Sequence, residues 1–135
     1  MEAELICLDT SVLIDYFRKT RKEKSFLFEL THRYSSFAVS IITEYEIMVG
    51  AKESQRAFWE EFFEQVQILP FERRDSKEAV RIYHELKKAR KLIDIPDLFI
   101  GASAKSNGLS LATLNKKHFS RISALKLITP KDLEV

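Results

Sequence analysis

The chain has 135 residues, a length typical of one domain with a core of its own. Its composition, 45% hydrophobic and 31% charged with few glycines and prolines, excludes a fibrous or disordered protein. The net charge of +2 is too small to identify a nucleic-acid partner by itself. We therefore expect residues 1–135 to form a single domain whose function depends on how its charges are arranged.

A single cysteine, Cys7, excludes an internal disulfide framework. Because it stands in an apolar run, we expect a small buried side chain rather than a nucleophile. The N-terminus carries Glu2 and Glu4 before that run, which does not fit a signal peptide, and no run approaches the roughly 18 apolar residues of a membrane span. These features predict a cytoplasmic protein with no membrane segment.

The apolar run 5–8 ends on an acid, Asp9. Four successive apolar residues are too few for a buried helix but fit a strand covered on both faces, as in a parallel sheet. Thr10 or Ser11 can then cap a helix whose apolar positions follow at helical spacing. Ligands of open α/β sheets bind beyond the carboxyl ends of the strands, so Asp9 is either a site residue or simply the end of a strand.

The rest of the chain alternates helices and short strands. Apolar spacing and cap residues predict helices over 25–34, from 41 or 43 to 49, over 54–66, from 75 or 76 to 91, over 95–106 and over 115–122. Strands are expected over 37–40, 67–71, 109–113 and 125–128. With no tight hairpin signal between strands, this order predicts an α/β fold with a mostly parallel sheet of four or five strands.

Four aromatic residues form one apolar face of the predicted helix 54–66, and this face suits the core or a dimer surface. Basic residues gather in 18–24, and no acid occurs from 98 to 131, whereas acids gather in 44–64. A basic surface around an acidic pocket suits a metal enzyme acting on a polyanion, although solvated helix faces produce the same counts.

Three acids stand where an α/β nuclease needs them. Asp9 ends a strand, Glu46 lies in the helix after the second strand, and Asp97 lies in the first turn of a later helix. Mg²⁺ prefers oxygen ligands and keeps several waters, so a few carboxylates from different segments suffice to bind it. The three histidines lie far apart, and no spacing resembles a zinc site.

Four segments occur in a recognisable order: LDTSVLID (8–15), ITEYEIMVG (42–50), IPDLFIGA (95–102) and LATLNKKHF (111–119). Together they resemble the PIN-domain ribonucleases, and among these the VapC-like toxins of prokaryotic toxin–antitoxin pairs. The resemblance covers nearly the full length of the chain. It implies a PIN-like three-layer α/β/α sandwich in which Asp9, Glu46 and Asp97 bind Mg²⁺ or Mn²⁺.

The resemblance also implies a reaction, metal-assisted hydrolysis of RNA phosphodiester bonds, and partners, namely a second copy of the chain and a small VapB-like antitoxin. Ser11 and Thr10 are placed to orient Asp9 or the attacking water. The bases best placed by sequence to hold the RNA backbone are Lys116, Lys117 and Arg121.

Some positions allow two interpretations. Glu44 lies two residues before Glu46 and so on another helix face, which makes it a surface or supporting residue. Asp94 is either a further metal ligand or a helix cap. Asp15, six residues after Asp9 in a helix of 3.6 residues per turn, faces away and is expected to be structural.

The fourth segment departs from the family pattern, because many relatives carry another acid where this chain has Asn115 and His118. Asn115, close to Thr113, can still bind a metal-bound water or a phosphate, but a second metal site is left open. The alternatives to a nuclease are a degenerate PIN domain that binds RNA or protein without cleavage, and an aspartate-based phosphatase. The phosphatase would use Asp9 as phosphoryl acceptor and would need an acid where Ser11 stands.

Overall fold

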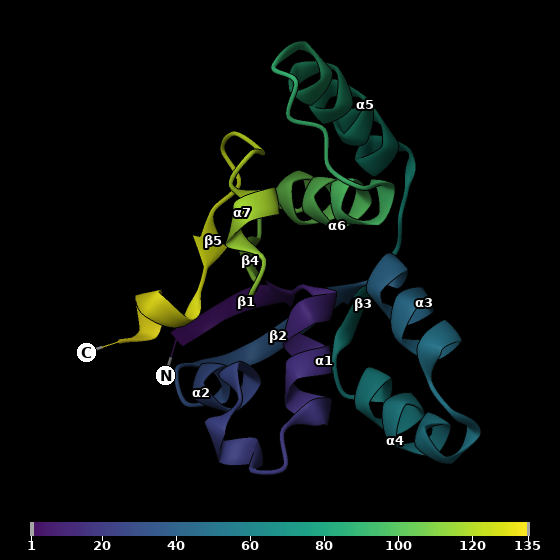
Figure 1. Ribbon diagram of the computed structural model, residues 1–135, viewed down its shortest axis with the longest axis vertical. Helices are drawn as coiled ribbons and strands as arrows, with labels where there is room; N and C mark the ends of the chain where they lie inside the picture. Colours follow the sequence, from purple (N-terminus) through teal and green to yellow (C-terminus); the bar gives the residue numbers. More distant parts are fainter. Residues whose placement is uncertain (1, 135) are drawn as a thin grey trace.

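The computed structural model describes residues 2–134, in which one or two α-helices separate successive strands (Figure 1). The strands are β1 (Glu2–Leu8), β2 (Tyr34–Ser40), β3 (Gln67–Leu69), β4 (Ser110–Ala112) and β5 (Leu127–Ile128). The helices are α1 (Thr10–Arg18), α2 (Phe26–Thr31), α3 (Ile41–Gly50), α4 (Glu53–Glu64), α5 (Arg73–Lys88), α6 (Ile95–Ser106) and α7 (Lys116–Phe119), with 3₁₀ turns at Lys22–Lys24 and Pro130–Leu133.

All five strands are parallel and lie in the order β3-β2-β1-β4-β5. The first strand is therefore the centre of the sheet, with β2 on one side and β4 on the other. Near its carboxyl end Leu8 is paired with both Val39 and Ala112. The α/β fold with a parallel sheet, predicted from the order of elements, is confirmed.

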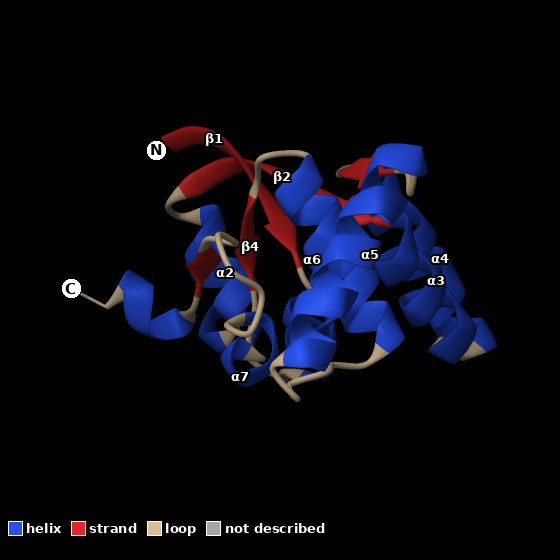
Figure 2. Cartoon of the chain, turned by 90° about the horizontal axis from the view of Figure 1, so that it is seen from above, coloured by secondary structure: helices blue, strands red, loops and turns tan. Residues whose placement is uncertain are grey.

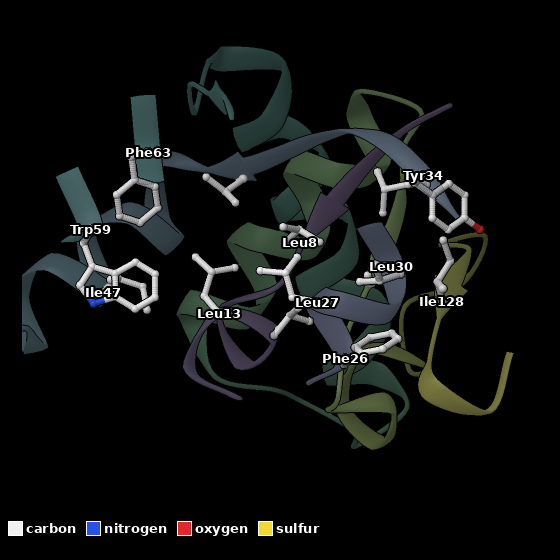
Figure 3. Packing of buried hydrophobic residues seen from close by; sticks show 14 residues of the cluster. Leu8, Leu13, Phe26, Leu27, Leu30, Tyr34, Ile47, Trp59, Phe63 and Ile128 are labelled. Carbon is white, nitrogen blue, oxygen red and sulfur yellow. The ribbon is translucent and has the colours of Figure 1, made fainter. Parts of the chain in front are cut away.

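Helices cover both faces of the sheet, and alternate residues of each strand face opposite layers. On one face Ile6 and Leu8 pack with side chains of α1, α2, α3 and α4. Figure 3 shows Leu8 and Leu13 near the middle of this cluster, with Trp59 and Phe63 toward one end. The two faces together give the three-layer α/β/α arrangement that the resemblance implies. Figure 2 shows strands β1, β2 and β4 in red beside the blue helices.

The opposite face of the sheet packs against α5, α6 and α7. Cys7, between Ile6 and Leu8, points to this side, as do Ala38 and Leu111 of the neighbouring strands. Because side chains on both faces of β1 are buried, its sequence is a continuous apolar run and does not alternate between apolar and polar residues. Among residues 2–134, no helix is both long enough and apolar enough to cross a membrane.

The predicted helix 25–34 is too long. Ser25 is its N-cap and accepts a hydrogen bond from the backbone N–H of Phe28, so the helix begins at Phe26 and ends at Thr31. Tyr34 is buried, as expected, but it belongs to β2, where it pairs with the first strand. Tyr34 follows Leu30 at the spacing of a helix, but its pairing with β1 places it in a strand, so this spacing is not evidence of a helix here.

The start and end of α5 also differ from the expectation. Glu72 is the N-cap, and Asp75 lies inside the first turn, where its carboxylate accepts a hydrogen bond from the backbone N–H of Glu72 at 2.7 Å. The helix ends at Lys88 because Arg90 adopts a positive φ of 58° and the N–H of Lys91 bonds back to the carbonyl of Leu86.

Helix α6 has the predicted bounds, whereas β3, β4, α7 and β5 are shorter than predicted at one or both ends. Of the aromatic face on α4, Trp59 and Phe63 are buried in the core, whereas Phe58 is 41% exposed. The core interpretation of this face is therefore confirmed for its two buried members.

The environment of Cys7 leads to a prediction about its reactivity. The side chain is fully buried, and burial, together with the nearby charge of Asp9, raises the pKa of the thiol to about 12. Because the thiolate is the reactive form, labelling of the folded protein at about pH 8 should be about 100-fold slower, or more, than labelling in guanidinium. The rate is measured with a chromogenic disulfide reagent, and equal rates in the two states would contradict the burial.

Candidate metal site at the edge of the sheet

Asp9 lies at the carboxyl end of the central strand, between the ends of β2 and β4. Its backbone N–H bonds to the carbonyl of Ala112 at 2.9 Å, which extends the pairing of β1 with β4 by one residue. The residue is only 3% exposed. Although Asp9 occupies the N-cap position of α1, its side chain makes no capping hydrogen bond. The carboxylate is therefore not used to begin the helix and is available for another role.

Two hydroxyl groups hold this carboxylate. Ser11 Oγ donates to Asp9 Oδ2 at 2.7 Å, and Thr113 Oγ1 donates to the same oxygen at 2.8 Å. Each hydroxyl in turn accepts a backbone N–H, from Leu114 onto Ser11 and from Asn115 onto Thr113. Backbone N–H groups of the loop after β4 thus hold both hydroxyls, and the hydroxyls hold Asp9 Oδ2. Neither hydroxyl bonds to Asp9 Oδ1.

Burial raises the pKa of the Asp9 carboxyl above its usual value. The hydrogen bonds from Ser11 and Thr113 and from the backbone of Thr10 oppose this rise, whereas the negative charge of Asp97 adds to it. A carboxylate that is buried and lies close enough to another acid to feel its charge is costly to ionise unless a cation is bound nearby.

Glu46 approaches the same edge from α3. Thr10 Oγ1, next to Asp9, donates to Glu46 Oε1 at 2.8 Å and lies 3.0 Å from Thr43 Oγ1. Thr43 is three residues before Glu46, so both side chains lie on the face of α3 that meets α1. This contact distinguishes Glu46 from Glu44, as the sequence analysis of the two acids predicts. Thr43 is not among the residues to which the sequence points, although its spacing from Glu46 is a usable signal.

Asp97 lies in the first turn of α6, and a histidine contacts it. His118 Nδ1, on α7, lies 3.1 Å from Asp97 Oδ2 and 2.9 Å from Asn115 Nδ2. The Asp97 side chain is 21% exposed and that of His118 is 37% exposed, so this part of the site opens toward solvent. Asp94, three residues earlier, occupies the N-cap position of α6, but its exposed side chain makes no capping hydrogen bond.

Hydrogen bonds and chain neighbours connect the three candidate ligands, from Glu46 through Thr10 to Asp9, and from Asp9 through Thr113 and the loop after it to Asp97. Among the side chains that the structure describes, those of residues 4–134, no three His, Cys, Asp or Glu groups stand close enough together to hold a metal ion as they are arranged here. The Glu46 carboxylate accepts a hydrogen bond from the Thr10 hydroxyl instead of facing a point that it shares with Asp9 and Asp97. Binding would therefore need a rotation of side chains or bridging waters, which Mg²⁺ usually keeps.

The donor set nevertheless fits a hard divalent cation. All three candidate ligands offer carboxylate oxygens, and Asp9 is a buried acid whose ionised form a cation would stabilise. The first residues of α1 and α3 follow directly on β1 and β2, so the fold delivers Asp9 and Glu46 to the same end of the sheet (Figure 1). The helix α3 also contacts α6, which carries Asp97.

The three candidate RNA-binding bases have different surroundings. Lys116 and Lys117 are exposed on α7, beside His118. Arg121 instead donates to the backbone carbonyls of Lys91 and Leu92, at 3.4 and 3.0 Å. Its guanidinium thus holds the loop that leads into α6, a role that the sequence does not reveal.

Asp15 has the structural role that the sequence predicts. Its carboxylate accepts the backbone N–H of Phe26 at 3.1 Å and forms an ion pair with Lys19 at 3.3 Å. The first of these contacts joins α1 to the start of α2, away from the edge that carries Asp9.

The raised pKa of Asp9 leads to a prediction about pH and stability. Because the folded-state pKa exceeds the unfolded one, ionised Asp9 destabilises the fold, and this penalty grows as pH rises through the two values. In metal-free buffer Asp9→Asn should therefore raise the melting temperature at neutral pH and have little effect at acid pH. Thermal unfolding in EDTA across a pH series measures the difference.

Asp132 supplies a control of opposite sign. Hydrogen bonds from the backbone N–H and hydroxyl of Thr129 hold the pKa of Asp132 below its usual value, so its carboxylate stabilises the fold above the unfolded pKa and this stabilisation is lost as pH falls. Asp132→Asn should lower the melting temperature at neutral pH. A lower melting temperature for Asp9→Asn as well would contradict the assignment of a buried, disfavoured charge.

The comparisons with known proteins agree with this fold and with the order of the motifs. The PIN domain family matches residues 6–125. Ribonuclease VapC1 of Methanocaldococcus jannaschii is 37% identical over 135 residues, an alignment that covers 93% of this chain and 87% of that protein.

Two solved structures are similar over almost the whole chain. A chain of VapBC-1 from nontypeable Haemophilus influenzae has a TM-score of 0.81 at 25% identity, covering 93% of this chain and 97% of that one. A chain of a toxin-antitoxin complex from Klebsiella pneumoniae has a TM-score of 0.75 at 29% identity, with the same coverage. The chain therefore belongs to the PIN-domain family, as a VapC-like member of it.

Proposed function

We propose that this protein is a Mg²⁺-dependent endoribonuclease that hydrolyses RNA phosphodiester bonds. The observation that carries the proposal is Asp9, a buried carboxylate with a raised pKa, fixed by two hydroxyls at the carboxyl edge of the sheet and close enough to Asp97 to feel its charge. The similarity to proteins named ribonuclease VapC supports the choice of RNA as substrate.

In this proposal Asp9, Glu46 and Asp97 hold the cation, Mg²⁺ or Mn²⁺. When bound, the ion would activate a water and offset the negative charge that develops on the leaving oxygen. Ser11 and Thr113 fix the orientation of Asp9 and so reduce the freedom that binding has to remove. The hydroxyl of Thr10 donates a hydrogen bond to the Glu46 carboxylate and so keeps this carboxylate beside Asp9.

The RNA backbone would lie over the open side of the site, where Asp97 and His118 are partly exposed. Lys116 and Lys117 stand there on exposed positions of α7, and their charges suit phosphate contacts. Arg121 contributes indirectly, because it holds the loop before Asp97.

The biological role that we propose is that of a toxin, made in the cytoplasm, where its RNA substrate is found, and inhibited by a small VapB-like antitoxin. Similar chains occur in structures described as VapBC and as a toxin-antitoxin complex, which supports such a partner. A homodimer is part of the proposal, and light scattering should then give twice the 15.8 kDa mass of one chain.

The central test is cleavage of defined RNAs by the purified protein. We expect cleavage in Mg²⁺, none in EDTA, and a loss of about 100-fold or more for Asp9→Asn, since ligands of a catalytic metal act together. Gel analysis of end-labelled RNA measures it. Cleavage that survives EDTA or the substitution would overturn the metal mechanism, whereas RNA binding without any cleavage would favour a degenerate PIN domain.

The pair Glu46 and Glu44 gives a matched test on one helix. Glu46→Gln removes the carboxylate that faces Thr10 and should lower kcat/KM by about 100-fold. Glu44→Gln changes the same residue type two positions away, on another face, and should leave kcat/KM within about threefold of the wild type. Equal losses in the two variants would contradict the assignment of Glu46.

A further inference from the structure

We propose that His118 is a positioning residue that holds the Asp97 carboxylate, and that with this histidine in place of a further carboxylate the site takes a single divalent cation. The inference rests on the metal site of the proposed function and assigns a role to the fourth sequence segment. It also decides between one and two ions, which the sequence leaves open.

The first step concerns hydrogen bonding around the imidazole. His118 Nδ1 lies within hydrogen-bond distance of two groups, Asp97 Oδ2 at 3.1 Å and the Asn115 amide at 2.9 Å. A single ring nitrogen cannot donate to one and accept from the other at the same time. The Asp97 carboxylate only accepts when ionised, so the favourable arrangement has the proton on Nδ1, donated to Asp97.

Asn115 fits this arrangement after a half-turn of its amide, which presents its oxygen rather than its nitrogen to the same N–H. Its own backbone N–H is fixed on Thr113 Oγ1 at 2.8 Å, the hydroxyl that also binds Asp9. His118 and Asp9 are thus positioned by the same short loop. A displacement of this loop would disturb both candidate ligands together.

The second step concerns how α7 comes so close to α6. Gly101 lies four residues after Asp97 and therefore on the same face of α6. A Cβ at Gly101 would lie 2.4 Å from Ile122 Cδ1 and 3.6 Å from Phe119 Cδ1, and both of these side chains are buried. The glycine thus allows the segment that carries His118 to pack against the face of α6 that carries Asp97.

The third step concerns charge. No Asp or Glu occurs between Asp97 and Asp132, so the loop after β4 and α7 bring no carboxylate to the site. The side chains that they do bring are neutral or basic: Thr113 bonds to Asp9, His118 contacts Asp97, and Asn115 contacts the His118 ring. Two divalent ions a few ångströms apart repel each other strongly. The three carboxylates of Asp9, Glu46 and Asp97 carry less negative charge than the four positive charges of two such ions.

Binding of Mn²⁺, followed by electron paramagnetic resonance and by calorimetry, tests both parts without relying on activity. The wild type should bind one ion per chain. Replacing the donor by an apolar group, His118→Leu, should weaken Mn²⁺ binding by about 10- to 100-fold, the usual effect of losing a group that orients a ligand. The conservative His118→Asn can retain an N–H near the position of Nδ1 and should stay closer to the wild type.

The variant His118→Asp tests the charge argument, because it adds a carboxylate beside Asp97 and should raise the number of bound Mn²⁺ ions from one to two. Circular dichroism and thermal unfolding show whether each variant is folded. Two ions in the wild type, or one in His118→Asp, would overturn the single-cation part; unchanged affinity in His118→Leu would overturn the positioning part.

These results are distinguishable from a failure of the proposed function. If the wild type binds one Mn²⁺ and the variants behave as expected, but no RNA is cleaved, the nuclease proposal fails and the inference stands. If RNA is cleaved and His118→Leu binds Mn²⁺ as the wild type does, the inference fails alone. If the wild type binds no Mn²⁺, the metal site and this inference are both wrong.

Discussion

The structure depends on the burial of one carboxylate at the end of its central strand. Asp9 is almost inaccessible to solvent, and an ionised acid in such a place is expensive unless it is compensated. Ser11 and Thr113 supply part of the compensation through hydrogen bonds, and their own acceptors are filled by backbone N–H groups. A cation bound as proposed above would compensate the remainder, so part of its binding free energy would come from relieving an unfavourable buried charge.

The sheet order explains why this position is the one that can be used. Because β1 lies between β2 and β4, the loops that follow all three strands meet at one edge. The segment after each strand contributes different groups. Helix α1 contributes the Thr10 hydroxyl, helix α3 contributes Glu46, and the segment after β4 contributes the hydrogen-bond partners of Asp9 and Asp97. An acid at the end of an edge strand would meet loops on one side only and would stay hydrated.

Most of the fold could be predicted from local patterns, because apolar runs, cap residues and glycines report on neighbours in the chain. The errors lie where distant parts decide. Tyr34 has helical spacing but joins β2 because β1 is there to pair with it, and Arg90 ends α5 through a backbone geometry that side-chain periodicity does not encode. In the site, the acids were visible as residue types, whereas the contacts of His118 and Arg121 depend on packing between distant segments and could not be predicted from spacing.

The bond between Thr113 and Asp9 joins residues that are 104 positions apart in the chain. Such a contact can form only after most of the polypeptide has been made and β4 has entered the sheet beside β1. During synthesis on a ribosome, the incomplete chain therefore has Asp9 and the hydroxyl of Ser11, but not Thr113 or the backbone N–H groups of Leu114 and Asn115 that complete these surroundings. If the nuclease activity proposed above requires this arrangement, the activity should appear only after these last segments have left the ribosome.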